Sequence, residues 1–207
     1  TYERMDSNTI KPNVAVIIPC YKALGKIDKV IEEVLDTLVL INELYNYKLI
    51  IINDACPQNS TRNIEENNLL KIINNKFNIG VGGSTLKGIN YALENKFDVI
   101  VKIDADGQHP PTYLTELIKY ILSLPEYKLF FTKGTRYKIR FNSDYVPFIR
   151  RLGTLFLDPI ARAALGYRGL SDVTNGFFGM NSTCASILFK TKSGSKIRSR
   201  YLFESSL

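Results

Sequence analysis

The sequence has few cysteines, and they are not arranged to stabilise a fold covalently. Cys20, Cys56 and Cys184 are widely spaced, odd in number and never form a Cys-x-x-Cys pair. A disulfide framework needs an even set of cysteines, and a structural zinc site needs closely spaced ones. We therefore exclude both and expect reduced thiols that are mostly buried.

Long apolar runs and targeting signals are also missing. No stretch approaches the roughly 18 consecutive apolar residues that a membrane-spanning helix requires. The polar N-terminal segment, residues 1–12, lacks the basic-then-apolar pattern of a secretory signal. We therefore expect a cytoplasmic setting and no segment that crosses a bilayer.

What is present fits one ordinary globular domain. The 207 residues are 45% hydrophobic and 23% charged, which is enough for one well-buried core but not for two full-sized domains. We find no internal repeat or linker and assign residues 13–207 to a single domain. The sequence starts at Thr1 and ends in the mostly apolar segment 201–207 without a helix-stop signal, so we expect the domain to be truncated at its C-terminus.

The net charge of +7 indicates an anionic partner. Nucleic acid, a membrane surface and a phosphorylated substrate all satisfy it. The basic residues are scattered and form no recognised nucleic-acid motif, so a nucleic acid is the least favoured of the three.

Apolar periodicity predicts an α/β fold. Short β-branched runs alternate with segments whose apolar residues recur at helical spacing. This alternation is typical of a Rossmann-like, mostly parallel sheet flanked by helices on both faces, with ligands at the carboxyl ends of the strands. The expected strands are 14–18, 48–52, 70–74, 98–103, 129–132 and 176–180, and the expected helices are 26–45, 82–95, 112–124 and 147–165.

One strand runs directly into two carboxylates and an amide, Asp104, Asp106 and Gln108. Residues i, i+2 and i+4 of an extended segment point the same way. Carboxylate and amide oxygens suit Mg²⁺ or Mn²⁺ shared with substrate phosphates. The segment therefore predicts a divalent metal bridging a diphosphate, and the alternative is a simple turn before a helix.

Polar or glycine-rich segments follow the earlier strands. In a doubly wound sheet, Tyr21 and Asp54 would be neighbours. We expect Tyr21 to lie against a nucleobase and Asp54 to accept a hydrogen bond from the base or ribose; a turn-capping carboxylate is the alternative for Asp54. The glycine-rich segment 78–88 matches neither a dinucleotide fingerprint nor a P-loop. It allows either close approach to a ligand or a tight turn into a helix.

In this order, these segments resemble a family 2 glycosyltransferase, closest to the dolichol- and polyprenyl-phosphate sugar transferases of the dolichol-phosphate mannose synthase type. The motif at 104–109 is the most specific part. Two segments depart from the family pattern: the usual Asp-Asp-Gly-Ser reads Asn53-Asp54-Ala55-Cys56, and Gly-Phe-Arg reads Gly176-Phe177-Phe178. The resemblance rests on residues 14–21, 53–54, 80–88, 104–109, 134–137 and 172–177.

The resemblance implies a GT-A fold and inverting transfer from a nucleotide-diphosphate sugar. It implies Mg²⁺ or Mn²⁺ on Asp104, Asp106 and Gln108. Contacts with the nucleotide sugar are expected at Pro19, Tyr21, Asp54, Gly80, Gly83, Lys87, Asp104, Ala105 and Asp106.

Three further residues are candidates for catalysis. Arg136 would face phosphate and stabilise the leaving group. A lipid-phosphate acceptor is already an anion and needs no base, whereas a sugar hydroxyl needs a carboxylate, for which Asp172 and Glu204 are the candidates. His109 is expected to be structural, beside the metal loop.

Three functions remain open. The first is transfer to a polyprenyl or dolichyl phosphate at the cytoplasmic face of a membrane, and the second is elongation of a cell-surface polysaccharide at a sugar hydroxyl. The third is a non-catalytic module that binds a nucleotide sugar. The segment 145–168 mixes large apolar residues with arginines, which suits either an anionic membrane interface or a core helix with a basic outer face.

Overall fold

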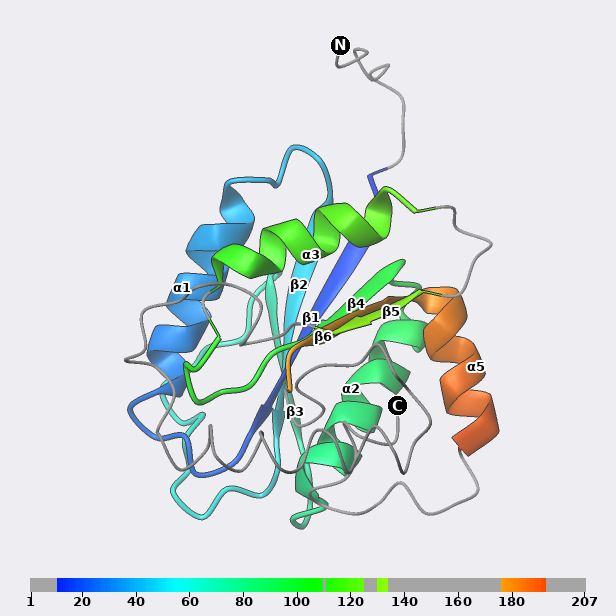
Figure 1. Cartoon of the computed structure of the whole chain (residues 1–207). Coiled ribbons are helices and arrows are strands. Elements are labelled where there is room, and N and C mark those ends of the chain that lie inside the picture. Colours follow the sequence, from blue (N-terminus) through cyan, green and yellow to red (C-terminus); the bar gives the residue numbers. More distant parts are fainter. Residues whose placement is uncertain (1–10, 110, 125–129, 134–175, 193–207) are drawn as a thin grey trace, which may run out of the picture.

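The computed structural model of the chain describes residues 11–109, 111–124, 130–133 and 176–192. These residues form a six-stranded sheet in the order β3-β2-β1-β4-β6-β5, with helices on both faces (Figure 1). The mixed α/β architecture with a mostly parallel sheet confirms the fold class expected from the sequence. Within the described residues, no helix combines the length and apolarity needed to span a bilayer.

Four strands make the parallel part of the sheet: β1 (Asn13–Cys20), β2 (Asn46–Asn53), β3 (Leu70–Asn74) and β4 (Val99–Lys102). β1 lies at the centre, paired with β2 on one side and β4 on the other. The middle of β1 is buried on both faces. This explains why it reads in the sequence as an uninterrupted apolar run rather than an alternating one.

The other part of the sheet is antiparallel and comes from far along the chain. β6 (Phe178–Asn181) lies antiparallel between β4 and β5 (Phe131–Lys133). A strand was predicted at 176–180, and β6 begins two residues later. The fifth strand was predicted at 129–132, and β5 begins two residues later and ends one residue later. The helix α5 (Ser182–Lys192) follows β6 directly and was not predicted.

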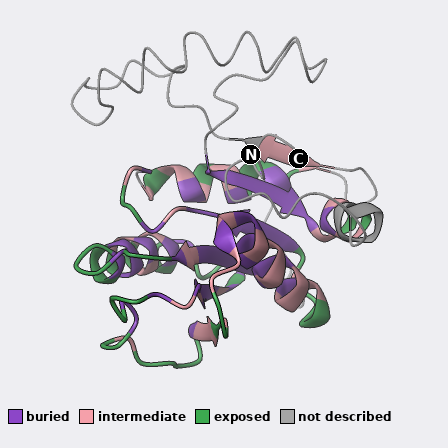
Figure 2. Ribbon diagram, turned by 90° about the horizontal axis from the view of Figure 1, so that it is seen from below, coloured by how far each residue is buried: buried purple, intermediate pink, exposed green. Residues whose placement is uncertain are grey.

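Two hydrophobic cores lie on opposite faces of the sheet. α1 (Ile27–Val39) and α3 (Thr112–Leu122) cover one face, and α2 (Gly80–Glu94) and α5 cover the other. Figure 2 shows buried residues concentrated in the sheet and on the helix sides that face it. Successive residues of β1 alternate between the two cores, as the two-residue repeat of a strand requires.

The boundaries of all three helices that were predicted within the described residues differ from the sequence prediction; α3 ends at Leu122 rather than Leu124. α1 ends at Val39 rather than near residue 45, because Ile41 and Leu44 donate to the carbonyls of Leu38 and Ile41 in tight turns instead of continuing the helix. α2 begins at Gly80, two residues earlier than predicted. The helix predicted at 147–165 lies outside the described residues.

A glycine brings α2 close to the centre of the sheet. A Cβ added at Gly88 would lie 2.5 Å from Cγ2 of Ile17 on β1. Only glycine leaves room for this approach. The N-terminal end of α2 is therefore held near the carboxyl ends of β1 and β2.

Candidate active site

A pocket of about 300 Å³ lies at the carboxyl edge of the parallel strands. It is formed where the loops after β1, β2, β3 and β4 meet the start of α2. The strand order reverses at β1, because β2 and β3 lie on one side of it and β4 lies on the other, and ligands of α/β proteins bind at such switch points. The described lining residues are Pro19, Cys20, Tyr21, Lys22, Ala23, Lys26, Asp54, Asn78, Gly80, Val81, Ser84, Asp104, Ala105 and Asp106.

The loop after β4 brings Asp104 and Asp106 to this pocket. β4 ends at Lys102, and the chain turns at 105–106 with φ of +74° at Gly107. The segment is thus a turn rather than the predicted extended strand, so the alternation of side chains along a strand does not place Gln108 beside the two carboxylates. Gln108 is not among the described lining residues, and its backbone N–H donates to Oδ1 of Asp106 at 3.0 Å.

Asp104 is held by two partners that the sequence analysis did not assign to it. Nζ of the fully buried Lys102 donates to its Oδ1 at 2.5 Å, and Nε2 of His109 lies 3.5 Å from its Oδ2. Burial alone would raise the pKa of Asp104, but the charge of Lys102 and the hydrogen bonds from His109 and Lys102 outweigh it and hold the pKa below its ordinary range. Asp104 is therefore a carboxylate at neutral pH.

The end of the antiparallel part of the sheet closes around this ion pair. A Cβ added at Gly176 would lie 2.5 Å from Nζ of Lys102 and would clash with the carboxylate of Asp104. His109 is 8% exposed and stacks on Phe177, with ring centroids 5.7 Å apart. The sequence signal for the ion pair is a lysine in an apolar strand, two residues before Asp104. Residues i and i+2 of a strand lie on the same face.

The donor set fits a divalent metal shared with a substrate. Among the described residues, no group of three or more His, Cys, Asp or Glu side chains is placed to hold an ion alone. Mg²⁺ commonly binds through one or two carboxylates plus substrate phosphates. Asp104 and the exposed Asp106 border the same pocket and supply carboxylates of that kind.

Asp54 has the contacts of a helix-capping carboxylate. Its Oδ1 accepts from the backbone N–H of Ile79 and from Nδ2 of Asn75, both at 2.8 Å, and its Oδ2 accepts from the N–H of Gly80 at 2.9 Å. It is 2% exposed. These contacts are those expected of a capping carboxylate, the alternative given for Asp54, and they fix the start of α2 beside the pocket.

Gly80, Gly83 and Lys87, which were predicted to contact the nucleotide sugar, lie at different places relative to the pocket. Gly80 borders the pocket with φ of +80°. Gly83 packs on Ile79, since an added Cβ would lie 3.0 Å from Cγ1 of that residue. Lys87 donates from Nζ to Oδ1 of Asn75 at 2.7 Å, and neither Gly83 nor Lys87 is among the described lining residues. The α2 N-terminus itself favours a negatively charged group.

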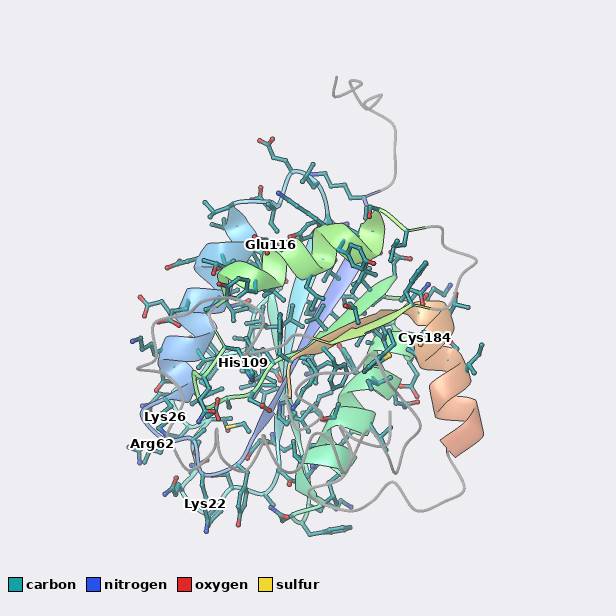
Figure 3. The ribbon with its side chains drawn as sticks, in the orientation of Figure 1. Lys22, Lys26, Arg62, His109, Glu116 and Cys184 are labelled. Carbon is teal, nitrogen blue, oxygen red and sulfur yellow. The ribbon has the colours of Figure 1, made fainter. Side chains whose placement is uncertain are left out.

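The opposite wall of the pocket is aromatic and basic. Pro19, Tyr21, Lys22 and Lys26 come from β1 and the loop that follows it. Tyr21 is 44% exposed, and Nζ of Lys22 lies 5.4 Å from its ring centroid. Figure 3 shows Lys22 and Lys26 at the same edge of the molecule. The wall offers a flat ring and positive charge to a ligand.

Some predicted residues cannot be placed. Arg136, Asp172 and Glu204 lie outside the described residues, as does the segment 145–168.

Comparison with known proteins agrees with the fold. The sequence matches the family model described as "Glycosyl transferase family 2" over residues 15–182, which is well over half of the chain and includes every described residue that lines the pocket.

Curated relatives share modest identity. A dolichol-phosphate mannosyltransferase of Pyrococcus furiosus is 26% identical over 171 residues, covering 81% of this chain and 46% of the relative. A UDP-N-acetylglucosamine–dolichyl-phosphate N-acetylglucosaminyltransferase of Methanococcus voltae is 28% identical over 193 residues, covering 84% and 72%. The chain therefore spans about half the length of the first of these relatives.

Two solved structures share the fold. Glucosyl-3-phosphoglycerate synthase from Mycobacterium tuberculosis, in complex with Mn²⁺, UDP and phosphoglyceric acid, has a TM-score of 0.58 at 14% identity, covering 83% of this chain and 56% of the other. Mannosyl-3-phosphoglycerate synthase from Rubrobacter xylanophilus has the same TM-score and identity, covering 83% and 53%.

Proposed function

Because the chain belongs to glycosyl transferase family 2, we propose that it transfers a sugar from a nucleotide-diphosphate sugar to a polyprenyl or dolichyl phosphate, with inversion and with Mg²⁺ or Mn²⁺. The observation that carries this proposal is the composition of the pocket. It combines two carboxylates, Asp104 and Asp106, with the N-terminus of α2 and the aromatic ring of Tyr21. Metal, phosphate and base each find a matching group there.

Each wall of the pocket then has a role in holding the donor. Asp104 and Asp106 would hold the metal, which when bound would supply positive charge for the leaving diphosphate. Lys102 and His109 fix the orientation of Asp104. The backbone at Gly80 and Val81 lies at the N-terminal end of α2, which attracts phosphate. Tyr21 stacks on the base. Gly83, Lys87 and Gln108 lie outside the described pocket lining.

The acceptor is proposed from the relatives and from the charge of the chain. Two of the curated relatives are named for dolichyl phosphate and another, from Micrococcus luteus, for undecaprenyl phosphate. A net charge of +7 favours approach to the anionic cytoplasmic face of a membrane, where such lipids are presented. In this reaction the acceptor phosphate oxygen attacks the anomeric carbon, the bond to the nucleotide diphosphate breaks, and no base is needed. Arg136 is the proposed cation near the leaving phosphate.

The first experiment is a binding panel. The melting temperature is measured with UDP-, GDP-, dTDP- and CDP-sugars, each with and without Mn²⁺ or Mg²⁺, since a ligand of the folded state raises it. We expect one nucleotide to stabilise the protein only with metal. Asp106→Asn should abolish this shift, whereas Glu116→Gln should keep it, because Glu116 is an exposed carboxylate on α3 outside the pocket lining (Figure 3).

Transfer is then assayed with the sugar nucleotide that binds. A short polyprenyl phosphate should be glycosylated, and the corresponding polyprenol without phosphate should not. Glycosylation of a free oligosaccharide instead would support polysaccharide elongation, with Asp172 or Glu204 as the base. Metal-dependent binding without transfer or donor hydrolysis would leave a binding module.

A further inference from the structure

The pairing between β1 and β2 continues past the last residues of both strands. The ladder ends at the Cys20 and Asn53 pair, and the N–H of Asp54 then donates to the carbonyl of Cys20 at 3.0 Å. Beyond this point, the backbone N–H groups of Lys22 and Ala23 donate to side chains. The N–H of Lys22 donates to Sγ of Cys56 at 3.1 Å. One residue on, Ala23 donates its N–H to Oγ of Ser60 at 3.1 Å.

The segment held by these bonds has an unfavourable backbone conformation. Lys22 has φ of +53°, in the left-handed region that side chains other than glycine rarely adopt. Consecutive N–H groups around such a residue form a concave pair that attracts a negative or strongly accepting group. Here Sγ of Cys56 and Oγ of Ser60, themselves 3.1 Å apart, supply the acceptors.

Cys56 is chemically suited to accept. Burial alone would raise the pKa of its thiol, but the hydroxyl and backbone of Ser60 and the N–H groups of Lys22 and Gln58 lower the pKa to about 7. A thiolate accepts a stronger hydrogen bond than a neutral thiol. The neighbouring Cys20 stays a thiol, because burial, together with the charges of Cys56 and Asp28, raises its pKa to about 12.

The same segment forms one wall of the pocket and starts a helix. Tyr21, Lys22 and Ala23 all line the pocket. The carbonyl of Ala23 accepts from the N–H groups of Lys26 and Ile27, both at 3.0 Å, and α1 begins at Ile27. Any change in the path of residues 21–23 therefore moves the aromatic and basic wall together.

We propose that Cys56 and Ser60, neither of which is among the described lining residues, are positioning residues that hold segment 21–23 in the conformation that receives the nucleotide. The inference rests on the proposed function, and it adds a pair that acts on the donor only through the backbone of the β1 loop. The departure from the family's Asp-Asp-Gly-Ser pattern at Cys56 thus keeps an acceptor at that position.

The contacts are tested without any ligand. Amide hydrogen exchange at Lys22 and Ala23 is followed by NMR in the wild type, Cys56→Ala, Ser60→Ala, Cys56→Ser and the control Cys184→Ala. Cys184 lies on α5, across the molecule from Lys22 (Figure 3). Loss of one hydrogen bond should speed exchange roughly threefold to tenfold in the two alanine variants. At pH 6, below the pKa of Cys56, Cys56→Ser and Cys184→Ala should match the wild type. Unchanged exchange in both Cys56→Ala and Ser60→Ala would overturn the proposal.

The consequence for the donor is tested with UDP, GDP, dTDP and CDP in the presence of Mn²⁺, by calorimetry on the full chain. For the nucleotide that the wild type binds, Cys56→Ala should raise the Kd roughly threefold to tenfold, and Cys56→Ser should restore it. Faster exchange with an unchanged Kd would overturn the positioning role. A wild type that binds none of the four nucleotides refutes the proposed donor site and the role in binding with it, whereas the exchange rates separately decide whether the pair holds the segment. A variant that fails to fold is replaced by Cys56→Ser and Ser60→Ala.

Discussion

Asp104 and Asp106 are two residues apart, yet their replacement should affect the protein in different ways. Asp104→Asn removes the carboxylate that faces Nζ of the fully buried Lys102. Removing one partner of a buried ion pair costs about 3 to 5 kcal/mol. The side chain of Asp104 is 29% exposed, so solvent reduces the loss, and we expect about 3 kcal/mol, at the lower end of that range. For a chain of this size that is a fall in melting temperature of roughly 6–12 °C.

Asp106→Asn should leave stability within about 0.5 kcal/mol of the wild type, as is usual at exposed positions. Asp106 is exposed, and its described bond is the N–H of Gln108 to Oδ1, which an amide oxygen also accepts. Both variants should lose metal-dependent nucleotide binding, but only Asp104→Asn should unfold early. Loss of function in Asp104→Asn is therefore not by itself evidence of metal ligation, and Asp106→Asn is the cleaner test of the site.

Urea unfolding of the two variants, followed by circular dichroism, measures the difference. A double variant, Lys102→Met with Asp104→Asn, should recover much of the stability, because replacing a buried pair with apolar or neutral groups is often neutral. If Asp104→Asn unfolds at the same urea concentration as the wild type, or if the double variant is less stable than the single one, the ion pair does not contribute as the structure indicates.

Three further changes have defined outcomes. Asp54→Asn should lower the free energy of unfolding in urea by about 1–3 kcal/mol, because an amide cannot accept from both helix N–H groups and from the Asn75 amide. Gly88→Ala should lower the free energy of unfolding by about 1–3 kcal/mol in the same assay, since its Cβ would lie 2.5 Å from Cγ2 of Ile17. An unchanged urea midpoint would mean that α2 shifts freely. The pKa of Cys56 falls from 9.0 to about 7 on folding. The stability of the wild type relative to Cys56→Ser should therefore be about 2 kcal/mol greater at pH 9 than at pH 6, and this extra stability should be lost as the pH falls through 7. A pH-independent difference would refute that titration.

The sequence predicts the parallel part of the fold well, because burial on both faces leaves a clear pattern. β1, β2 and β4 are continuous apolar runs, and the polar residues that follow them meet at one pocket. α1 is also evident, since its buried positions recur at helical spacing. Its end is less evident, because Ile41 is buried from a turn as effectively as it would be from a helix.

The rest depends on contacts between distant segments. Asp54 caps α2 through Ile79 and Gly80, and nothing next to Asp54 in the sequence distinguishes a cap from a nucleotide ligand. β6 is short, and its Gly179 serves packing, since a Cβ there would lie 2.7 Å from Cδ1 of Ile121 on α3. Its insertion between β4 and β5 and the helix that follows it have no local signal strong enough to predict them.

The position of β6 in the sheet also bears on how the protein folds as it is synthesised. Once the chain has been made to Lys102, strands β3, β2, β1 and β4 can pair in parallel, but β4 is then an edge strand whose partner, Phe178–Asn181, does not yet exist. Its residues Val99, Ile100 and Val101 are apolar, and an unpaired apolar edge is prone to pairing with other chains. The strand that leads into the carboxylates of the pocket is thus the last of the parallel strands to gain both neighbours, and a chain that ends before residue 178 would leave the apolar edge of β4 unpaired on that side.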